Sequence, residues 1–119
     1  MSQRFLSGDF LVFQLEAGFA LLRLLAVEGT GEDRTWHVAA YRDLFPDVET
    51  AEVASLGQNE LVLSNPHIAL TTRAFESTQV ARISNQPLTD VEEAPFQKWK
   101  SDADREVSDR SVRLMLGLR

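Results

Sequence analysis

Cysteine is absent from this 119-residue sequence, and long apolar runs are absent as well. Without cysteine the chain can form neither a disulfide framework nor a thiolate metal site, which favours a reducing compartment. The longest apolar run, residues 19–27, is interrupted by Arg23 and is far shorter than the about 20 apolar residues of a membrane-spanning helix. Acidic residues precede it, where a secretion signal requires a basic flank. We therefore expect a cytoplasmic protein that does not enter a membrane.

Basic residues are scarce. The chain has 12 Lys and Arg against 18 Asp and Glu, a net charge of −6, and residues 46–100 alone carry four basic against eight acidic residues. Nucleic-acid binding requires Lys and Arg clustered on one face, so this balance disfavours it. The acidic middle suits a basic protein partner, although acids that only keep the surface soluble explain it as well.

Sequence motifs for catalysis and metal binding are also missing. There is no Gly-x-Ser-x-Gly elbow, and Gly29-Thr30-Gly31 lacks the Gly-Lys-Ser/Thr that completes a phosphate loop. His37 and His67 stand 30 residues apart without the spacing of a zinc motif, and we expect structural or surface roles for both. The sequence thus predicts no catalytic residue, no metal and no cofactor.

The first 45 residues carry the strongest structural signal. Apolar segments at 10–15, 19–27 and 34–45 are separated by glycine-containing turns, a pattern typical of an antiparallel meander. Both alternating sets of side chains in the first two strands are apolar, so both faces of the sheet require cover. Asp9, after Gly8, is expected to cap a turn or to reach a polar group of the C-terminal arm.

The rest of the chain is less regular. Residues 46–56 could form one short helical turn or an edge segment, and Asn65-Pro66 is expected to end the apolar stretch before it. Segments 67–72 and 78–83 predict two further strands. Thr89 to Glu92 matches a helix capping box, in a helix that Pro95 should limit to about one turn. A longer helix is expected from Ser101 to about Leu116, with Phe96 and Trp99 as anchors before it.

These signals predict an α+β, mainly β, fold in a single domain, 1–119. Residues 1–83 should form a small bent antiparallel sheet or an SH3-like, partly open barrel of five to six strands. Residues 84–119 should form a C-terminal arm and helix that covers it. An exposed strand edge could pair two copies, so a monomer and a homodimer both stay open.

Two groups of residues are candidates for function. The first is an acidic, partner-binding set: Asp47, Glu49, Glu52, Glu60, Asp90, Glu92 and Glu93. The second is a possible pocket at the ends of one strand: Trp36, His37, Tyr41 and Arg42. Aromatic residues in a strand are common core residues, and carboxylates commonly serve solvation and capping, so each set also has a purely structural interpretation.

Two landmarks together cover about half of the chain. The first is Gly8-Asp9-Phe10-Leu11-Val12-Phe13, a Glu-Ala-Gly turn, and a strand of the form aromatic-x-x-x-Arg-apolar at 19–25. The second is Val80 to Leu88 followed by acids and Pro95. At both landmarks the sequence resembles the bacterial immunity protein 26 type family. The resemblance implies a partly barrel-like β fold and an antidote that binds and blocks a toxin delivered by a competing bacterium.

The first functional hypothesis is therefore a non-enzymatic protein-binding module, an immunity-type inhibitor whose acidic surface at 47–60 and 90–93 binds a basic toxin. The alternative is a small-ligand-binding protein or enzyme with a pocket near His37, Tyr41 and Arg42. A pocket that holds these side chains, with a shifted histidine pKa, would favour the alternative.

Overall fold

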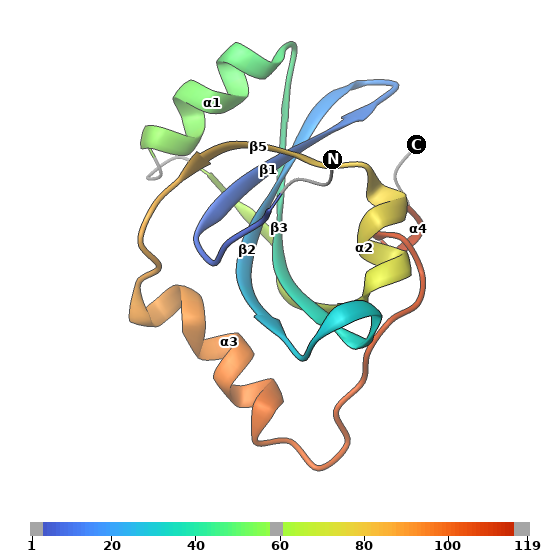
Figure 1. The fold of residues 1–119 in the computed structure, drawn as a ribbon. Coiled ribbons are helices and arrows are strands. Elements are labelled where there is room, and N and C mark those ends of the chain that lie inside the picture. The colour runs from blue at the N-terminus through green and yellow to red at the C-terminus, as the bar shows by residue number, and fades with distance from the viewer. Residues whose placement is uncertain (1–3, 58–60, 116–119) are drawn as a thin grey trace.

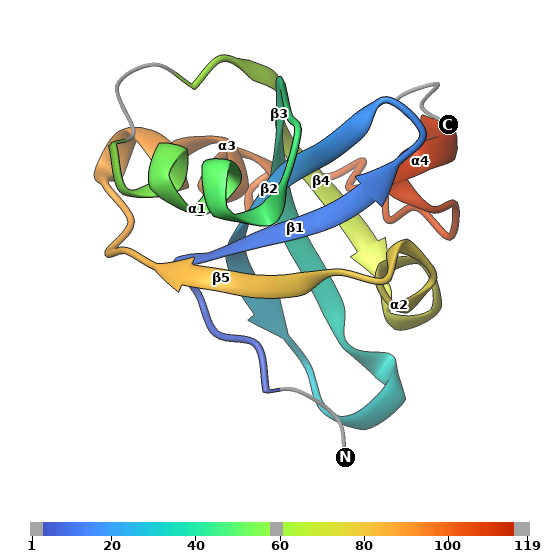
Figure 2. The same cartoon turned by 90° about the horizontal axis from the view of Figure 1, so that it is seen from above.

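The computed structural model describes residues 4–57 and 61–115, which form a curved, open five-stranded antiparallel sheet with helices on both sides (Figure 1 and Figure 2). The elements follow in the order β1 Asp9–Leu15, β2 Gly18–Glu28, a 3-10 turn Gly31–Asp33, β3 Thr35–Phe45, α1 Val48–Gly57, β4 Leu63–Thr71, α2 Thr72–Thr78, β5 Ala81–Asn85, α3 Asp90–Lys100 and α4 Val112–Met115. The sheet order β4-β3-β2-β1-β5 contains the predicted meander as its centre. The mainly β, α+β fold class is confirmed.

Both faces of the sheet are buried, as the apolar strands predict. One face carries the main core, in which Leu22, Leu24 and Val38 pack under Phe75 of α2 and Val112 of α4. The opposite face holds two smaller clusters, one against Ala51 of α1 and one against Phe96 of α3. Figure 1 shows the same division, with α1 and α3 on one side of the sheet and α2 and α4 on the other. Among the described residues, no helix is long and apolar enough to cross a bilayer.

The long helix predicted from Ser101 to about Leu116 does not form. The helix lies earlier, at α3, and within the described residues only Val112–Met115 is helical after it. The intervening segment instead pairs with the edge strand β4: Ser108 donates its N–H to the Ala69 carbonyl and accepts from the Thr71 N–H. These tertiary hydrogen bonds outweigh the helix propensity of the segment.

The expected effects of two prolines were also wrong. Pro95 lies inside α3 rather than ending it after one turn. Its missing N–H leaves only the Val91 carbonyl of the exposed first turn without a helical donor, which water can satisfy. Pro66 lies inside β4, which is an edge strand, where a residue without an N–H is tolerated. The capping box of Thr89 and Glu92 is confirmed.

The irregular segments between the strands form two helices that were not predicted in full. Residues 48–57 form α1 rather than a single turn, and residues 72–78 between the last two strands form α2. The Thr71 hydroxyl caps α2 by accepting from the Ala74 N–H at 3.1 Å.

Gly8 and Asp9 join the first strand to β5. Gly8 has φ +90°, donates its N–H to the Leu24 carbonyl, and accepts from the Gln86 N–H. The buried Asp9 carboxylate caps the preceding turn by accepting from the Leu6 N–H at 2.7 Å. It also accepts from Asn85 Nδ2 at 2.8 Å, so it reaches a polar group of the segment predicted as the C-terminal arm, residues 84–119, at a position that the structure assigns to the end of β5.

Gly8→Ala should destabilise the fold strongly. A Cβ at this position would overlap the Gln86 carbonyl oxygen, and the positive φ is strained for alanine. We expect a loss of at least about 2 kcal/mol in the free energy of unfolding, measured by urea denaturation. Gly57→Ala is the matched control, because a Cβ there meets open space. An equal effect of the two substitutions would contradict the assigned role of Gly8.

Candidate functional site

Arg23 is the charged residue at the centre of the candidate site. It is fully buried in the apolar strand β2, and its guanidinium forms a two-point ion pair with Glu92 at 3.2 and 3.4 Å. It also donates to the carbonyl oxygens of Gly8 at 2.6 Å and Pro87 at 3.2 Å, and it lies over the Phe10 ring. A buried charge is tolerated only with such partners. Arg23 therefore holds the first turn of α3 against the sheet.

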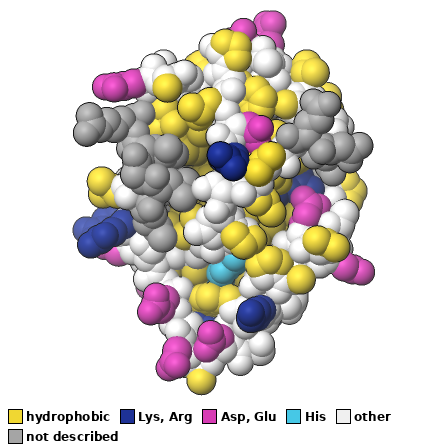
Figure 3. Space-filling model, turned by 180° about the vertical axis from the view of Figure 1, so that it is seen from behind, with side chains coloured by type: hydrophobic (Ala, Val, Ile, Leu, Met, Phe, Trp, Pro, Cys, Tyr) yellow, Lys and Arg dark blue, Asp and Glu magenta, His cyan; other side chains and the backbone are white. Residues whose placement is uncertain are grey.

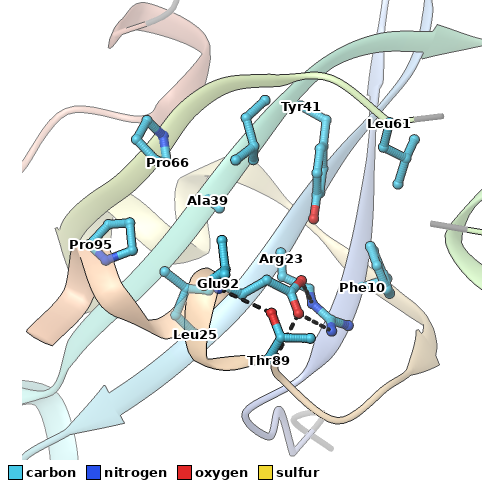
Figure 4. Close-up of a pocket in the computed structure, with 12 residues that line it drawn as sticks. Phe10, Arg23, Leu25, Ala39, Tyr41, Leu61, Pro66, Thr89, Glu92 and Pro95 are labelled. Atoms are coloured by element: carbon cyan, nitrogen blue, oxygen red, sulfur yellow. Dashed lines mark hydrogen bonds and ion pairs between the residues drawn. The ribbon is translucent and has the colours of Figure 1, made fainter. Parts of the chain in front are cut away.

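A cavity of about 260 Å³ lies beside this ion pair, between the sheet and the start of α3. Most of its wall is apolar and includes Phe10, Leu25, Ala39, Leu61, Leu63 and Pro95. The polar part of the wall consists of Arg23, Tyr41, Thr89 and Glu92. Figure 4 shows that Tyr41 and Glu92 come from opposite sides of the cavity, from β3 and α3. A mainly apolar pocket with a few convergent polar groups is typical of a binding site.

Tyr41 provides a hydroxyl group on the cavity wall. Burial raises the pKa of Tyr41 to about 12, the nearby Arg23 acts in the opposite direction, and Glu92 adds to the increase. The phenol is therefore protonated at neutral pH and is not a general base. It can donate a hydrogen bond to an occupant of the cavity, or accept one.

The two histidines meet on the same face of the sheet, beyond the cavity. His37 Nδ1 lies 2.9 Å from His67 Nε2, and His37 Nε2 lies 2.9 Å from Glu28 Oε1. Because the Glu28 carboxylate accepts, His37 Nε2 carries the proton, and its Nδ1 then accepts from His67 Nε2–H. The result is a continuous chain of hydrogen bonds from Glu28 through His37 to His67.

Aromatic side chains of α3 enclose this histidine pair. Phe96 and Trp99 lie 4.4 and 4.6 Å from the His37 ring, measured between ring centroids. Burial lowers the pKa of His37, against the opposing effect of Glu28. Burial, and then the neighbouring His37, lower the pKa of His67 to about 4. Both rings are therefore neutral at pH 7. His67 is the more exposed of the two, and Figure 3 shows a histidine surface flanked by hydrophobic side chains on the back of the molecule.

The four residues of the predicted pocket do not come together. His37 and Tyr41 lie on the face of the sheet that α3 covers, but only Tyr41 lines the cavity. Trp36 lies on the opposite face, stacked on Phe75 at 4.1 Å, and its Nε1 donates to the Thr72 hydroxyl. Arg42 is exposed and does not line the cavity.

The predicted acidic residues have mixed roles. Asp47 Oδ1 accepts from the Thr50 N–H and hydroxyl, both at 2.7 Å, which caps α1 and lowers the Asp47 pKa. Glu92 completes the capping box of α3 and binds Arg23. Glu60 lies outside the described residues. Glu49, Glu52, Asp90 and Glu93 form no side-chain hydrogen bond or ion pair with residues 4–57 or 61–115.

Sequence reasoning missed the two pairings that organise the site. The lone Arg23 in an apolar strand was a usable signal, because a buried charge needs an opposite charge elsewhere in the chain. Nothing in the sequence indicates which of the 18 acidic residues it binds. The histidine pair depends on the register of β3 against β4, where His37 faces Ala69 beyond a bulge.

Among the described residues, no three His, Asp or Glu side chains are placed to hold a metal ion.

Comparisons with protein-family models, with curated proteins and with solved structures find no match to this chain. The family resemblance therefore stays a prediction.

The histidine pair should make the fold less stable in acid. Because the folded-state pKa of His67 is depressed to about 4, the unfolded chain binds more protons once the pH falls below about 6.5. Stability that is present above pH 6.5 is then lost as the pH falls towards 4. Between pH 7 and pH 4.5 the free energy of unfolding should fall by roughly 2 kcal/mol less in His67→Gln than in the unchanged protein, as measured by urea denaturation.

The ionisable groups next to the pair are Glu28 of β2, Lys100 of α3, and Glu106 and Arg110 of the following segment, which line the same groove as His67. Glu106→Gln is the control, because it changes an exposed acid beside the same histidine. An unchanged pH dependence in His67→Gln would show that His67 does not titrate differently in the two states.

Proposed function

We propose that this chain is a non-enzymatic protein-binding module of the immunity type, which binds and blocks a basic toxin. The observation that carries the proposal is a set of exposed apolar side chains on α1 and α3, the helices that also carry Glu49, Glu52, Asp90 and Glu93, which form no ion pair with residues 4–57 or 61–115. Val53 and Leu56 are 70% and 59% exposed on α1, and Val91 is 82% exposed on α3. Val53 and Leu56 are three positions apart and share one face of α1. Exposed apolar side chains favour a protein interface.

We name this surface the α1/α3 surface and define it by Glu49, Glu52, Val53, Leu56, Asp90, Val91 and Glu93. Both helices cover the same face of the sheet (Figure 1), so one partner can contact both. The acids would attract a basic partner and speed its association, and the apolar side chains would supply the area that becomes desolvated. The net charge of −6 agrees with a basic partner.

The interior supports a binding role over catalysis at the cavity. Arg23 and Glu92 neutralise each other, and the raised pKa of Tyr41 keeps its phenol protonated. These groups can hold a partner or a ligand in place, and the protonated phenol of Tyr41 is not a general base.

A small-ligand-binding protein or enzyme is the second candidate function. It is favoured by the cavity at Tyr41 and by the depressed pKa values of His37 and His67, which are linked to Glu28. The cavity and the histidine pair lie on the same face of the sheet, on the two sides of Ala39. An enzyme that uses His67 as a base should lose activity in His67→Gln, whereas an immunity protein should retain its protective effect.

The proposed function is tested by co-expressing the chain in a bacterial host with each protein that is encoded beside its gene. We expect one of these proteins to arrest growth and the chain to restore it. Glu49→Lys combined with Glu52→Lys should reduce rescue, because the double charge reversal places four units of charge change on the α1/α3 surface. If none of the encoded neighbours is toxic, or if the arrest persists with the chain present, the proposal is wrong.

The matched control is Asp102→Lys combined with Asp104→Lys. It changes the net charge by the same amount in an exposed segment outside the α1/α3 surface. Equal loss of rescue in both double variants would mean that overall charge, and not this surface, determines binding.

A further inference from the structure

We infer that the cavity beside Arg23 is an anchor pocket, which receives one large apolar side chain of the partner while basic residues flanking that side chain meet the acids of the first turn of α3. The inference rests on the proposed function and names the chemistry of its partner. Protein interfaces commonly place one aromatic or aliphatic anchor in a pocket near their centre.

The pocket is held open by rigid elements. Phe10, Arg23 and Tyr41 come from three adjacent strands, and α3 forms the wall opposite them (Figure 4). The four hydrogen bonds of Arg23 to Glu92, Gly8 and Pro87 fix the first turn of α3 at its distance from the sheet. A preformed pocket costs little ordering entropy when a partner binds, which favours an anchor role.

The size and the wall of the pocket define its occupant. A volume of about 260 Å³ accommodates one large side chain and leaves no room for a folded segment. Leu25, Ala39 and Pro95 provide apolar contacts for the body of that side chain. The Tyr41 hydroxyl can bond its polar end, and Trp and Tyr are the side chains that combine a large apolar body with one polar group.

The rim favours a protein occupant over a small molecule. Leu63 is 49% exposed and Val91 is 82% exposed, and both belong to the lining of the cavity. A small molecule inside the cavity would leave the outer parts of these side chains in water. A protein that inserts one side chain would cover them with its own surface.

The charges of the first turn of α3 favour basic residues next to the anchor. Val91 and Glu92 of this turn line the cavity, and the same turn carries Asp90 and Glu93, whereas the basic residues of α3, Lys98 and Lys100, lie at its other end. Arg23 adds no net positive charge, because Glu92 neutralises it. An anchor with Lys or Arg neighbours therefore complements the rim.

The test is a titration of isotope-labelled protein, followed by NMR, with the capped peptide Lys-Lys-Trp-Lys-Lys. We expect chemical-shift changes at the amides of Ala39, Tyr41, Leu61 and Val91. The peptides Lys-Lys-Ala-Lys-Lys and Glu-Glu-Trp-Glu-Glu should bind at least about tenfold more weakly, since one lacks the anchor and the other has the wrong charge. The inference is overturned if the shifts fall elsewhere or if the three peptides bind equally.

Free indole separates a small-molecule site from an anchor pocket. If indole binds the cavity as tightly as the Lys-Trp peptide does, the flanking contacts contribute nothing, and the cavity is a small-ligand site. That outcome overturns the anchor role but leaves a positive growth rescue unaffected, so the inference and the proposed function can fail separately.

Two variants locate the contact. Ala39→Leu fills the floor of the cavity and should abolish the peptide-induced shifts. Val91→Lys adds a positive charge at the exposed rim, where it should not disturb folding. It should weaken the binding of the peptide Lys-Lys-Trp-Lys-Lys at least about tenfold. Leu114→Lys is the matched control, because this residue of α4 is 71% exposed and lies on the other side of the sheet. Equal weakening by Val91→Lys and Leu114→Lys would contradict the anchor site.

Discussion

The ion pair between the buried Arg23 and the partly exposed Glu92 is the interaction on which the rest of the structure depends. It joins residues 69 positions apart, and the same guanidinium binds the carbonyls of Gly8 and Pro87. An arginine with no exposed surface would be strongly destabilising without these acceptors. The hydrogen bonds of the buried Arg23 thus fix the positions of the residue before β1, the loop after β5 and the first turn of α3. The cavity exists because this turn is held at a set distance from the sheet.

The fold follows from the sequence where local signals are strong. Apolar segments bounded by glycine-containing turns predict β1, β2 and β3, and the capping box predicts the start of α3 at Thr89. The errors in the predicted secondary structure arise where tertiary contacts determine the conformation of a segment. Ser108 pairs with the edge strand β4 instead of extending a helix, and Pro66 is tolerated because β4 is an edge. Neither outcome can be derived from local propensity, because both depend on where β4 lies in the sheet.

The candidate site was predictable only in part. The structure puts His37, Ala39 and Tyr41 on one face of β3, as strict alternation requires, but it puts Trp36, which the predicted pocket grouped with His37 and Tyr41, on the other face. The partners of these residues come from distant segments: His67 from β4, and Phe96 with Glu92 from α3. Glu92 shows the difficulty most clearly, since its sequence context fits a surface acid and its carboxylate binds Arg23 instead. Charge balance identifies an acidic protein but does not distinguish the acids that face solvent from those that serve the interior.

The most direct test of this account is a double-mutant cycle on Arg23 and Glu92, with stability measured by urea denaturation. Arg23→Met and Glu92→Gln should each destabilise the fold, because each leaves the other charge without its partner. The double variant should be less destabilised than the sum of the two by at least about 1 kcal/mol. Additive effects, within about 0.5 kcal/mol, would show that the two residues act independently and would contradict the central role of the pair.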